Sequence, residues 1–360
     1  MRAAVMRNQQ LVVDTLPDPE PGPGEVLVRT LACGICGSDL HFLKHAPRMV
    51  DAMRRSSGPY VLDLSRDLVM GHEFCAEVVD YGPDCQRALK AGTRVCSMPL
   101  ALRPTQVVGI GYSNDTPGGY GEYMALSEML LLEVPNGLST AHAALTEPMA
   151  VGWHAVAKAN LTPDDVPLVI GCGPVGLAVI AALKIRGVGP IVAADFSSGR
   201  RRLAEALGAE IVVDPATTSP YRTWEDAARK PDAAGLTGLL ALLMPPYRPA
   251  VLFECVGVPG VIQQMAEGAP RHARIVVVGV CMEADRLEPM FAINKELNLQ
   301  FVLGYTPEEF AASLHHLAEG RIAAQPLITD TVGVEGVAGA FDALANPDRH
   351  AKILVEPWHA

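Results

Sequence analysis

The sequence lacks the features that would place it at a membrane, outside the cell or on a nucleic acid. No uninterrupted apolar run approaches the roughly 18 residues that a membrane-spanning helix needs. The first residues, Met1 to Val13, contain no apolar region of the kind found in export signals, so we expect a cytoplasmic protein. No basic block is longer than Arg200–Arg202 and the net charge is −11, which argues against nucleic acids and anionic membranes as partners.

Cysteine is present, but it is scattered. The eight cysteines are dispersed over the chain, and without an export signal a disulfide framework is not expected. Cys33 and Cys36 form a C-x-x-C pair. The surrounding β pattern lacks the βαβ context of a thioredoxin-like redox motif. We therefore favour a metal-ligand role for Cys36 over a redox pair.

The chain of 360 residues has the length of about two domains with sizeable cores. Up to about residue 31 the apolar residues alternate as in strands, around a Pro/Gly cluster. From Val166 to about Tyr305 a regular β–α alternation predicts a six-stranded, mostly parallel sheet. Two stretches, 45–68 and 216–249, show no clear pattern.

Single residues predict where some helices begin and end. Ser139 is the expected N-cap of a helix that Pro148 kinks or divides. Two helices of the parallel-sheet region are expected to end at Gly187 and Gly208.

The last segment, 306–360, contains two helical stretches and a closing strand, Lys352 to Val355. Its strand has no predicted partner in the parallel sheet, so we expect it to rejoin the N-terminal β elements. The sequence thus predicts an α/β fold in which a Rossmann-type doubly wound sheet is inserted into a discontinuous β-rich domain. The expected domains are 153–305 for the former, and 1–152 with 306–360 for the latter.

The stretch from Val166 to Asp195 has the order of a dinucleotide-binding unit: strand, glycine turn, helix, strand, acidic residue. Gly171 allows the tight turn, Gly173 lets a pyrophosphate approach the backbone, and Gly176 lets the helix pack closely on the strand. The helix N-terminus favours the phosphates. A carboxylate at Asp195 would accept the ribose hydroxyls and repel a 2′-phosphate, so NAD is favoured over NADP. The alternative is an α/β turn without a ligand.

Further cofactor contacts are expected at the helix start, after the second strand and at the ends of later strands. The residues are Pro174, Val175, Arg200, Val256 and Val280. Arg200 would partly counter Asp195 by pairing with a phosphate.

Three side chains, Cys36, His72 and Glu147, suit a catalytic metal site. Zn²⁺ takes thiolate, imidazole and carboxylate ligands, and a catalytic site needs three of them and an open position. Taken singly, each has another explanation: a buried apolar cysteine, a turn histidine and a glutamate at a helix terminus. Their wide spacing in the sequence does not by itself bring them together.

Five motifs nevertheless occur in a recognisable order. They are Cys36-Gly37-Ser38-Asp39-Leu40-His41, Gly71-His72-Glu73, Gly119-Tyr120-Gly121-Glu122-Tyr123, Glu147-Pro148-Met149-Ala150 and Gly171-Cys172-Gly173-Pro174-Val175-Gly176. Together they resemble the zinc-dependent medium-chain dehydrogenases over essentially the whole chain. The glutamate before proline is similar to the sorbitol, threonine and glucose dehydrogenase branch. The resemblance implies that the discontinuous domain is GroES-like.

The resemblance also implies a role for individual residues. Cys36, His72 and Glu147 would hold the catalytic zinc, with Glu73 beside them as an outer or transient fourth ligand. Ser38 would bond the substrate oxygen and start a proton relay that passes through the cofactor ribose to His41. Two further residues are implied: Asp39 would orient His72, and Lys352 would lie near the cofactor phosphates.

One feature of the family is missing from this sequence. Many members bind a structural zinc through four closely spaced cysteines, whereas the segment from Cys96 to Gly121 has one cysteine and no histidine. We therefore expect one zinc ion per chain and no structural zinc, with the segment held by its prolines and apolar packing. In this family a sheet edge such as Leu299 to Leu303 commonly pairs across a two-fold axis, so a homodimer or homotetramer is expected.

The expected function is hydride transfer between NAD(H) and a small secondary alcohol, diol or polyol, or the corresponding carbonyl, by a zinc enzyme. Two alternatives remain at this point. One is a zinc-independent reductase of the same superfamily that acts on an enone or quinone. The other is a non-catalytic protein that retains the cofactor fold. The sequence does not name the substrate, its stereochemistry or the direction of the reaction.

Overall fold

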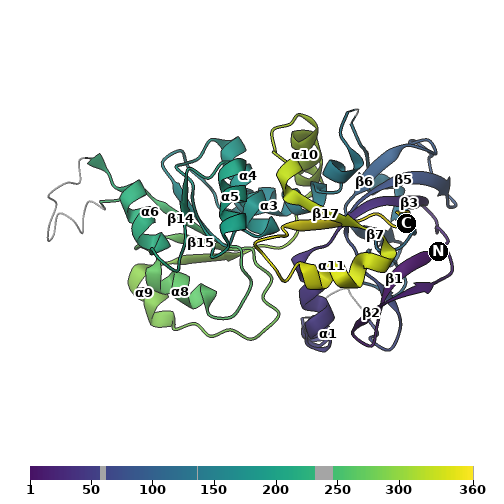
Figure 1. Ribbon diagram of the computed structural model, residues 1–360, viewed down its shortest axis with the longest axis horizontal. Helices are drawn as coiled ribbons and strands as arrows, with labels where there is room; N and C mark the ends of the chain where they lie inside the picture. Colours follow the sequence, from purple (N-terminus) through teal and green to yellow (C-terminus); the bar gives the residue numbers. More distant parts are fainter. Residues whose placement is uncertain (57–61, 136, 232–245, 360) are drawn as a thin grey trace. The chain divides into compact units, whose positions relative to one another are not determined.

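The computed structural model describes residues 1–56, 62–135, 137–231 and 246–359. The chain divides into two compact units, both drawn in Figure 1. The first unit comprises Met1–Pro148 and Pro307–Ala360, and the second comprises Met149–Thr306. The second unit is continuous in sequence and interrupts the first.

A parallel sheet of six strands forms the centre of the second unit. The strands are β11 (Val166–Ile170), β12 (Val192–Ala194), β13 (Ile211–Val213), β14 (Ala250–Glu254), β15 (Arg274–Val277) and β16 (Asn298–Phe301). Their spatial order is β13-β12-β11-β14-β15-β16, so the direction of winding reverses between β11 and β14. The predicted Rossmann-type sheet is confirmed, and ligands of such sheets bind at this reversal.

Helices cover both faces of this sheet, with α4 and α5 on one face and α8 and α9 on the other (Figure 1). The helices of the second unit are α3 (Thr146–Lys158, which begins in the first unit), α4 (Pro174–Arg186), α5 (Ser198–Leu207), α6 (Pro220–Ala228), α8 (Val261–Gly268) and α9 (Pro289–Lys295). Alternate strand residues such as Leu168 and Leu252 pack with Trp224 and Met265 in one buried cluster, as the two-residue period of a strand requires.

The end of α4 shows how local sequence fixes these helices. Gly187 follows the helix at φ 68°, a left-handed conformation that favours glycine, and closes it with backbone hydrogen bonds to the last turn. Gly208 closes α5 in the same way at φ 119°. The predicted helix stops at Gly187 and Gly208 are confirmed.

The first unit is built on mainly antiparallel sheets, and the largest sheet combines strands that precede the second unit with two strands that follow it and pair in parallel. Its strands are β1 (Arg2–Arg7), β2 (Gln10–Thr15), β3 (Glu25–Gly34), β4 (Leu68–Val69), β5 (Glu73–Tyr81), β6 (Arg94–Ser97), β7 (Leu100–Arg103), β8 (Gln106–Gly109), β9 (Tyr123–Ser127), β10 (Leu131–Glu133), β17 (Ile328–Val332) and β18 (Lys352–Val355). In the largest sheet β18 lies between β3 and β17. The predicted return of the closing strand to the N-terminal β elements is confirmed.

The segment after β6 forms a β-hairpin. Strands β7 and β8 pair with each other in register from Leu100↔Gly109 to Arg103↔Gln106. In the family that this sequence resembles, the corresponding segment often carries the cysteine ligands of a structural zinc. In this chain the segment contains a two-stranded hairpin.

Helix α1 (Gly37–Arg55) extends into the stretch 45–68, which shows no clear pattern in the sequence. His45 interrupts its helical geometry at φ −121° and ψ 18°. Pro47 follows two residues later, and proline lacks the N–H that a regular turn needs there. The other helices of this unit are η1 (Glu128–Leu130), α2 (Thr140–Ala143), α10 (Pro307–Ala318), η3 (Gln325–Leu327), η4 (Val334–Gly336) and α11 (Val337–Ala343).

The expected helix from Ser139 onward needs a correction. Ser139 is the N-cap, as predicted, and its side chain accepts the N–H of His142. The division into α2 and α3 falls before Thr146 and not at Pro148. The Thr146 hydroxyl donates to the Ala143 carbonyl at 2.7 Å across this break. Pro148 lies in the first turn of α3, where a missing N–H is tolerated.

The other stretch without a clear sequence pattern, 216–249, contains helix α6. Its residues 232–245 lie outside the described residues. Among the helices of the described residues, none combines the length and apolar character needed to cross a membrane.

Candidate active site

Three potential metal ligands meet in the first unit. The ligand atoms of Cys36, His72 and Glu73 all lie within 4.8 Å of one another. His72 and Glu73 are buried, and Cys36 is half-buried. A thiolate, an imidazole and a carboxylate are ligand types that Zn²⁺ takes in proteins. The structure therefore brings together two of the three predicted ligands, Cys36 and His72, and places Glu73 beside them.

Two chain segments bring Cys36 and His72 together. Cys36 lies directly before α1, where its N–H bonds the Asp39 side chain at 3.2 Å. His72 lies directly before β5 and follows Gly71, which has φ +102°. A Cβ on Gly71 would overlap the ring of Tyr120 and the sulfur of Cys33. A glycine is thus required at this position.

Asp39 is the carboxylate that faces His72. It is fully buried, and its Oδ1 lies 3.4 Å from His72 Nδ1, without the alignment of a hydrogen bond. The Tyr120 hydroxyl donates to Asp39 Oδ2 at 2.6 Å. With Nδ1 turned toward Asp39, Nε2 of His72 is left for a metal ion. Burial acts to raise the pKa of Asp39, but the contacts with His72 and Tyr120 outweigh it and leave the pKa lowered.

The two zinc-ligand candidates have shifted proton affinities. Burial raises the pKa of the Cys36 thiol, and the Glu73 carboxylate adds to the shift. Burial acts to lower the pKa of His72, but its electrostatic contacts with Tyr112, Asp39 and Cys36 outweigh burial and leave the pKa raised. A bound cation is the natural counter-charge for this group of acidic side chains, since a metal ion deprotonates a coordinating thiol. The donor set therefore fits a zinc ion.

Glu73 forms a buried ion pair with Lys352. The Lys352 ammonium group donates to both carboxylate oxygens, at 2.8 and 2.5 Å, and to the Ile35 carbonyl at 3.0 Å. Lys352 is 2% exposed and Glu73 is 0% exposed. Desolvation acts to lower the pKa of Lys352, but Glu73 outweighs it and keeps the amine protonated.

Lys352 was expected near the cofactor phosphates, and the structure shows the contacts that its ammonium group makes within the first unit. An ammonium group has three donors, and all three are used inside the first unit. Within the first unit Lys352 is therefore paired with Glu73, and its place near the cofactor phosphates stays a prediction. The two residues are far apart in sequence, and no local pattern pointed to the pair.

Glu147, the third predicted ligand, does not belong to the group of residues whose ligand atoms lie within 4.8 Å of one another. It is 9% exposed, lies in the first turn of α3, and its charge helps to raise the pKa of Lys352. His41, the predicted end of the proton relay, is half-buried on α1, one turn after Ser38.

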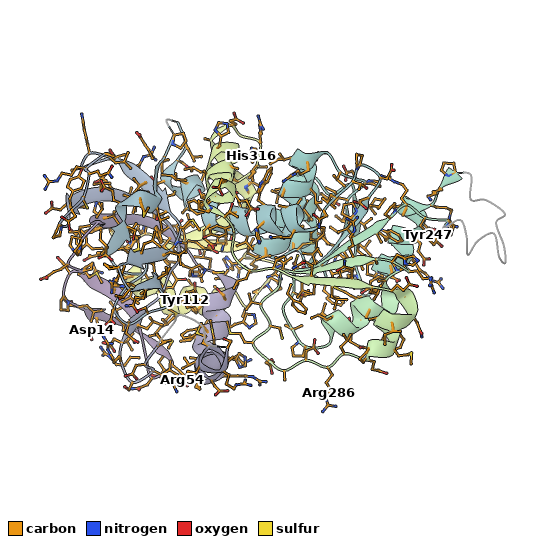
Figure 2. All side chains as sticks on the ribbon, turned by 180° about the vertical axis from the view of Figure 1, so that it is seen from behind. Asp14, Arg54, Tyr112, Tyr247, Arg286 and His316 are labelled. Carbon is orange, nitrogen blue, oxygen red and sulfur yellow. The ribbon has the colours of Figure 1, made fainter. Side chains whose placement is uncertain are left out.

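Ser38 has a partner that the sequence did not suggest. Its Oγ lies 2.8 Å from the hydroxyl of Tyr112, a residue labelled in Figure 2 beside α1. The Tyr112 ring packs on His72, with ring centroids 5.1 Å apart. Burial raises the pKa of Tyr112 far above its ordinary value, so the phenol is protonated. Tyr112 follows the β7–β8 hairpin. The sequence analysis expected only prolines and apolar packing in this segment and did not single out the tyrosine.

The second unit holds the glycine turn after β11. Gly171 has φ +90°, and a Cβ there would overlap Val256. A Cβ on Gly176 would overlap the Gly171 carbonyl oxygen, so this glycine permits the close contact between helix and turn. A Cβ on Gly173 would meet only the Arg200 guanidinium, at 3.8 Å. The space over Gly173 is therefore open to a ligand, as a pyrophosphate site requires.

Asp195 lies after β12 and holds the glycine turn in place. Its Oδ2 accepts the Cys172 N–H and its Oδ1 accepts the Ser197 N–H, both at 2.8 Å. The Arg200 guanidinium lies 4.0 Å from the carboxylate. The Arg200 Nε is buried and has no hydrogen-bond partner among the described residues. Each carboxylate oxygen retains a lone pair for a ribose hydroxyl.

The remaining predicted cofactor residues lie around this turn. Pro174 and Val175 begin α4. Val256 and Val280 follow β14 and β15, and although apolar they are 39% and 47% exposed. Exposed valines at the carboxyl ends of parallel strands offer an apolar surface next to the position where Rossmann-type sheets bind dinucleotides.

A thiolate–imidazole–carboxylate group in one unit and a dinucleotide-type glycine turn in the other define a zinc-dependent dehydrogenase that uses a nicotinamide cofactor. The zinc-binding dehydrogenase family matches residues 174–319, and the alcohol dehydrogenase GroES-like domain matches residues 22–136. The chain belongs to the zinc-dependent medium-chain alcohol and polyol dehydrogenase family.

Individual relatives are similar over nearly their whole length. The chain is 32% identical to (R,R)-butanediol dehydrogenase of Bacillus subtilis (strain 168), over 99% of this chain and 100% of the relative. It is 29% identical to sorbitol dehydrogenase of Bos taurus, over 95% and 94% of the two chains. The crystal structure of 2R,3R-butanediol dehydrogenase from Bacillus subtilis covers 99% of both chains at 30% identity, with a TM-score of 0.79.

Proposed function

We propose that this dehydrogenase transfers hydride between NAD(H) and a small secondary alcohol, diol or polyol, or the corresponding carbonyl. The main support is the group formed by Cys36, His72 and Glu73, whose ligand atoms lie within 4.8 Å of one another in the same unit as Ser38. The substrate class is supported by the relatives, which are named for butanediol and sorbitol.

We assign zinc to Cys36, His72 and Glu147, with Glu73 as the neighbouring carboxylate. The contacts of Glu73 support this division. Both of its oxygens accept hydrogen bonds from Lys352, so its charge is already balanced. Glu147 is 9% exposed and its charge acts on Lys352, which supports its choice as the carboxylate ligand.

The chain's own residues then have defined tasks. When bound, zinc supplies Lewis acidity that acidifies an alcohol hydroxyl, and a nicotinamide supplies the hydride acceptor. Ser38 Oγ accepts the proton from the substrate hydroxyl and passes its own proton onward, with His41 as the terminal group near solvent. Asp39 holds the imidazole of His72 in one orientation. Val256 and Val280 give the cofactor an apolar surface.

We propose NAD as the preferred cofactor because Asp195 lies where a 2′-phosphate would meet a negative charge. Arg200 opposes this effect in part, since its guanidinium lies 4.0 Å from Asp195 and next to the open face of Gly173. A relative that is 26% identical, a zinc-binding dehydrogenase from Sinorhizobium meliloti, is described as bound to NADP. The comparison of NAD⁺ with NADP⁺ is therefore a real test of Asp195.

We propose one zinc ion per chain and no structural zinc. Among the described residues, the three-ligand group Cys36–His72–Glu73 is the metal-type cluster found. The segment 96–121 is described throughout, and it forms the β7–β8 hairpin with Cys96 buried on β6. Cys96 Sγ donates to the Ala143 carbonyl at 3.2 Å, which gives this sulfur a structural role.

We also propose a homodimer or homotetramer in the cytoplasm, with residues 1–152 and 306–360 as the catalytic domain and 153–305 as the NAD-binding domain. Strand β16 pairs on one side with β15 and is at the edge of its sheet. Phe301 and Leu303, at the end of this strand, are 64% and 87% exposed. Exposed apolar edges favour pairing with another chain. A monomeric mass by light scattering at micromolar concentration would contradict this assembly.

The decisive experiment measures NADH formation from NAD⁺ with a panel of diols, polyols and simple secondary alcohols, before and after chelation of zinc. The proposal expects turnover that chelation abolishes and added zinc restores. Turnover that resists chelation would indicate the zinc-independent reductase. Cofactor binding without turnover on any substrate would indicate a non-catalytic protein.

A further inference from the structure

The Ser38 side chain forms a hydrogen bond with the side chain of Tyr112. The two hydroxyl oxygens are 2.8 Å apart. Ser38 and Tyr112 are both half-buried, as is the neighbouring Cys36, so the pair lies at the accessible side of the metal-ligand group. His72, on the inner side of this group, is 7% exposed.

The Tyr112 ring is held from two sides. It packs edge-on against Phe42 of α1, with centroids 5.8 Å apart and planes at 89°. It also packs against the His72 ring, with centroids 5.1 Å apart. Two ring contacts leave the side chain little freedom, and a hydroxyl on a fixed ring is a pre-organised hydrogen-bonding group.

The loop that carries Tyr112 is equally well defined. Gly111 has φ +78°, and a Cβ on it would touch the Gly71 backbone at 3.0 Å. The Thr116 hydroxyl donates to the Gly109 carbonyl at 2.8 Å, and the Gly111 N–H bonds the Thr116 carbonyl at 3.0 Å. The loop after the hairpin is therefore packed against the residue that precedes His72, and it brings Tyr112 to the site.

The direction of the hydrogen bond follows from the donors and acceptors present. The Tyr112 hydroxyl has Ser38 Oγ at 2.8 Å and Asp39 Oδ1 at 3.5 Å. The longer distance is at the limit of a hydrogen bond, so the Tyr112 proton is better used on Ser38. A serine hydroxyl has one donor and two acceptor sites. With Tyr112 on one acceptor site, Ser38 keeps the other for a substrate hydroxyl and its own proton for onward transfer.

We propose that Tyr112 is a positioning residue for Ser38, fixing the serine hydroxyl toward the substrate oxygen by donating a hydrogen bond to Ser38 Oγ. The inference rests on the proposed function, in which Ser38 takes the substrate proton. Tyr112 also donates to the oxygen on which negative charge gathers as Ser38 releases its own proton. Its contribution is therefore greater in the transition state than in the bound ground state.

The test compares Tyr112→Phe with wild type. This variant keeps both ring contacts and removes only the hydroxyl. We expect kcat to fall about 10- to 100-fold, as for the loss of one hydrogen bond to a group that gains charge. KM and zinc content should stay within about twofold of wild type, the pattern of an interaction made in the transition state. In a Ser38→Ala background the same change should have no further effect on kcat, since coupled residues are not additive.

The matched control is Tyr81→Phe. Tyr81 also loses one hydrogen bond, from its hydroxyl to the Leu89 carbonyl at 2.5 Å, and it is not part of the site. It should lower thermal stability slightly and leave kcat unchanged. Wild-type kcat in Tyr112→Phe, a loss of zinc in that variant, or an effect that adds fully to Ser38→Ala would each overturn the proposal.

A structural readout keeps this inference separate from the proposed function. In crystals of the wild type, Ser38 should have one side-chain conformer, and in Tyr112→Phe it should have several. A single unchanged conformer in the variant would overturn the positioning role, whether or not the enzyme turns over. A wild type that oxidises no alcohol would overturn the proposed function, and the conformers of Ser38 would still decide the role of Tyr112.

Discussion

The two units prepare their sites by opposite means. In the first unit, charged and polar side chains are buried against each other: Glu73 and Asp39 are 0% exposed and Lys352 is 2% exposed. In the second unit, the backbone itself makes the site, through the left-handed Gly171 and the absence of a side chain at Gly173 and Gly176. A change in the first site leaves a buried group without its partner. A change in the second site puts an atom where there is no room or where a ligand must pass.

The largest loss of activity is expected when a metal ligand is removed. Glu147→Gln should lose most of its zinc and nearly all activity, because an amide is a poor replacement for a carboxylate ligand. The Glu73→Gln/Lys352→Met double variant, which removes the neighbouring ion pair as a unit, should keep zinc with roughly 10- to 100-fold lower affinity. Elemental analysis after dialysis against a weak chelator measures both. Equal zinc loss in the two would make Glu73 a direct ligand.

The next largest effect concerns stability. Lys352→Met leaves Glu73 buried without its counter-charge, so we expect a loss of about 3–5 kcal/mol in the free energy of unfolding. The double variant Glu73→Gln/Lys352→Met should recover most of this loss, because no charge is then left unpaired. Urea unfolding of the metal-free protein gives the values. A single variant as stable as wild type would show that water reaches Glu73.

The glycine turn should behave differently at its two inner positions. Gly176→Ala should lower the free energy of unfolding by about 1–3 kcal/mol, because its methyl group overlaps the Gly171 carbonyl. Gly173→Ala should leave stability nearly unchanged and weaken NADH binding, because its methyl group fits the chain but fills the open space. Thermal unfolding and NADH fluorescence titration separate the two effects. Tight NADH binding to Gly173→Ala would remove the pyrophosphate from this position.

The smallest effect is expected at Asp195. Asp195→Asn loses the charge and keeps one of the two oxygens that accept backbone N–H groups, so the preference for NAD⁺ over NADP⁺ should fall by about tenfold. The kcat/KM ratio for the two cofactors is the measurement, with Arg200→Gln as the matched variant that should shift the ratio the other way. A wild type that prefers NADP⁺ would refute the role given to Asp195.

The fold was predictable where the determinants are close in sequence. The helix stops at Gly187 and Gly208, the strand–turn–helix order at Val166 to Asp195 and the N-cap at Ser139 depend on a few adjacent residues, and each was confirmed. The division between α2 and α3 was placed wrongly, because Pro148 lies in the first turn of α3, where a missing N–H is tolerated and the helix is not divided.

The site was predictable only in part, because its contacts join distant segments. Ser38 and Tyr112 are 74 residues apart, and Glu73 and Lys352 are 279 residues apart. Motifs named the residues of the ligand group, but nothing in them shows which carboxylate a lysine will neutralise. Tyr120 was in a quoted motif and still gave no sign that its hydroxyl bonds Asp39. Such side-chain contacts form only when the folded sheets bring the distant segments together.

The place of β18 between β3 and β17 also sets an order of events during synthesis. The second unit is one uninterrupted stretch, so a ribosome releases all of it before β18 exists. Domains generally fold as units as they emerge from the ribosome. The nucleotide-binding unit can therefore fold first. At that stage Glu73 has no ion-pair partner, because Lys352 belongs to β18. Until that strand is made, the zinc ligands lie beside an unneutralised carboxylate, and the metal site is completed among the last parts of the molecule.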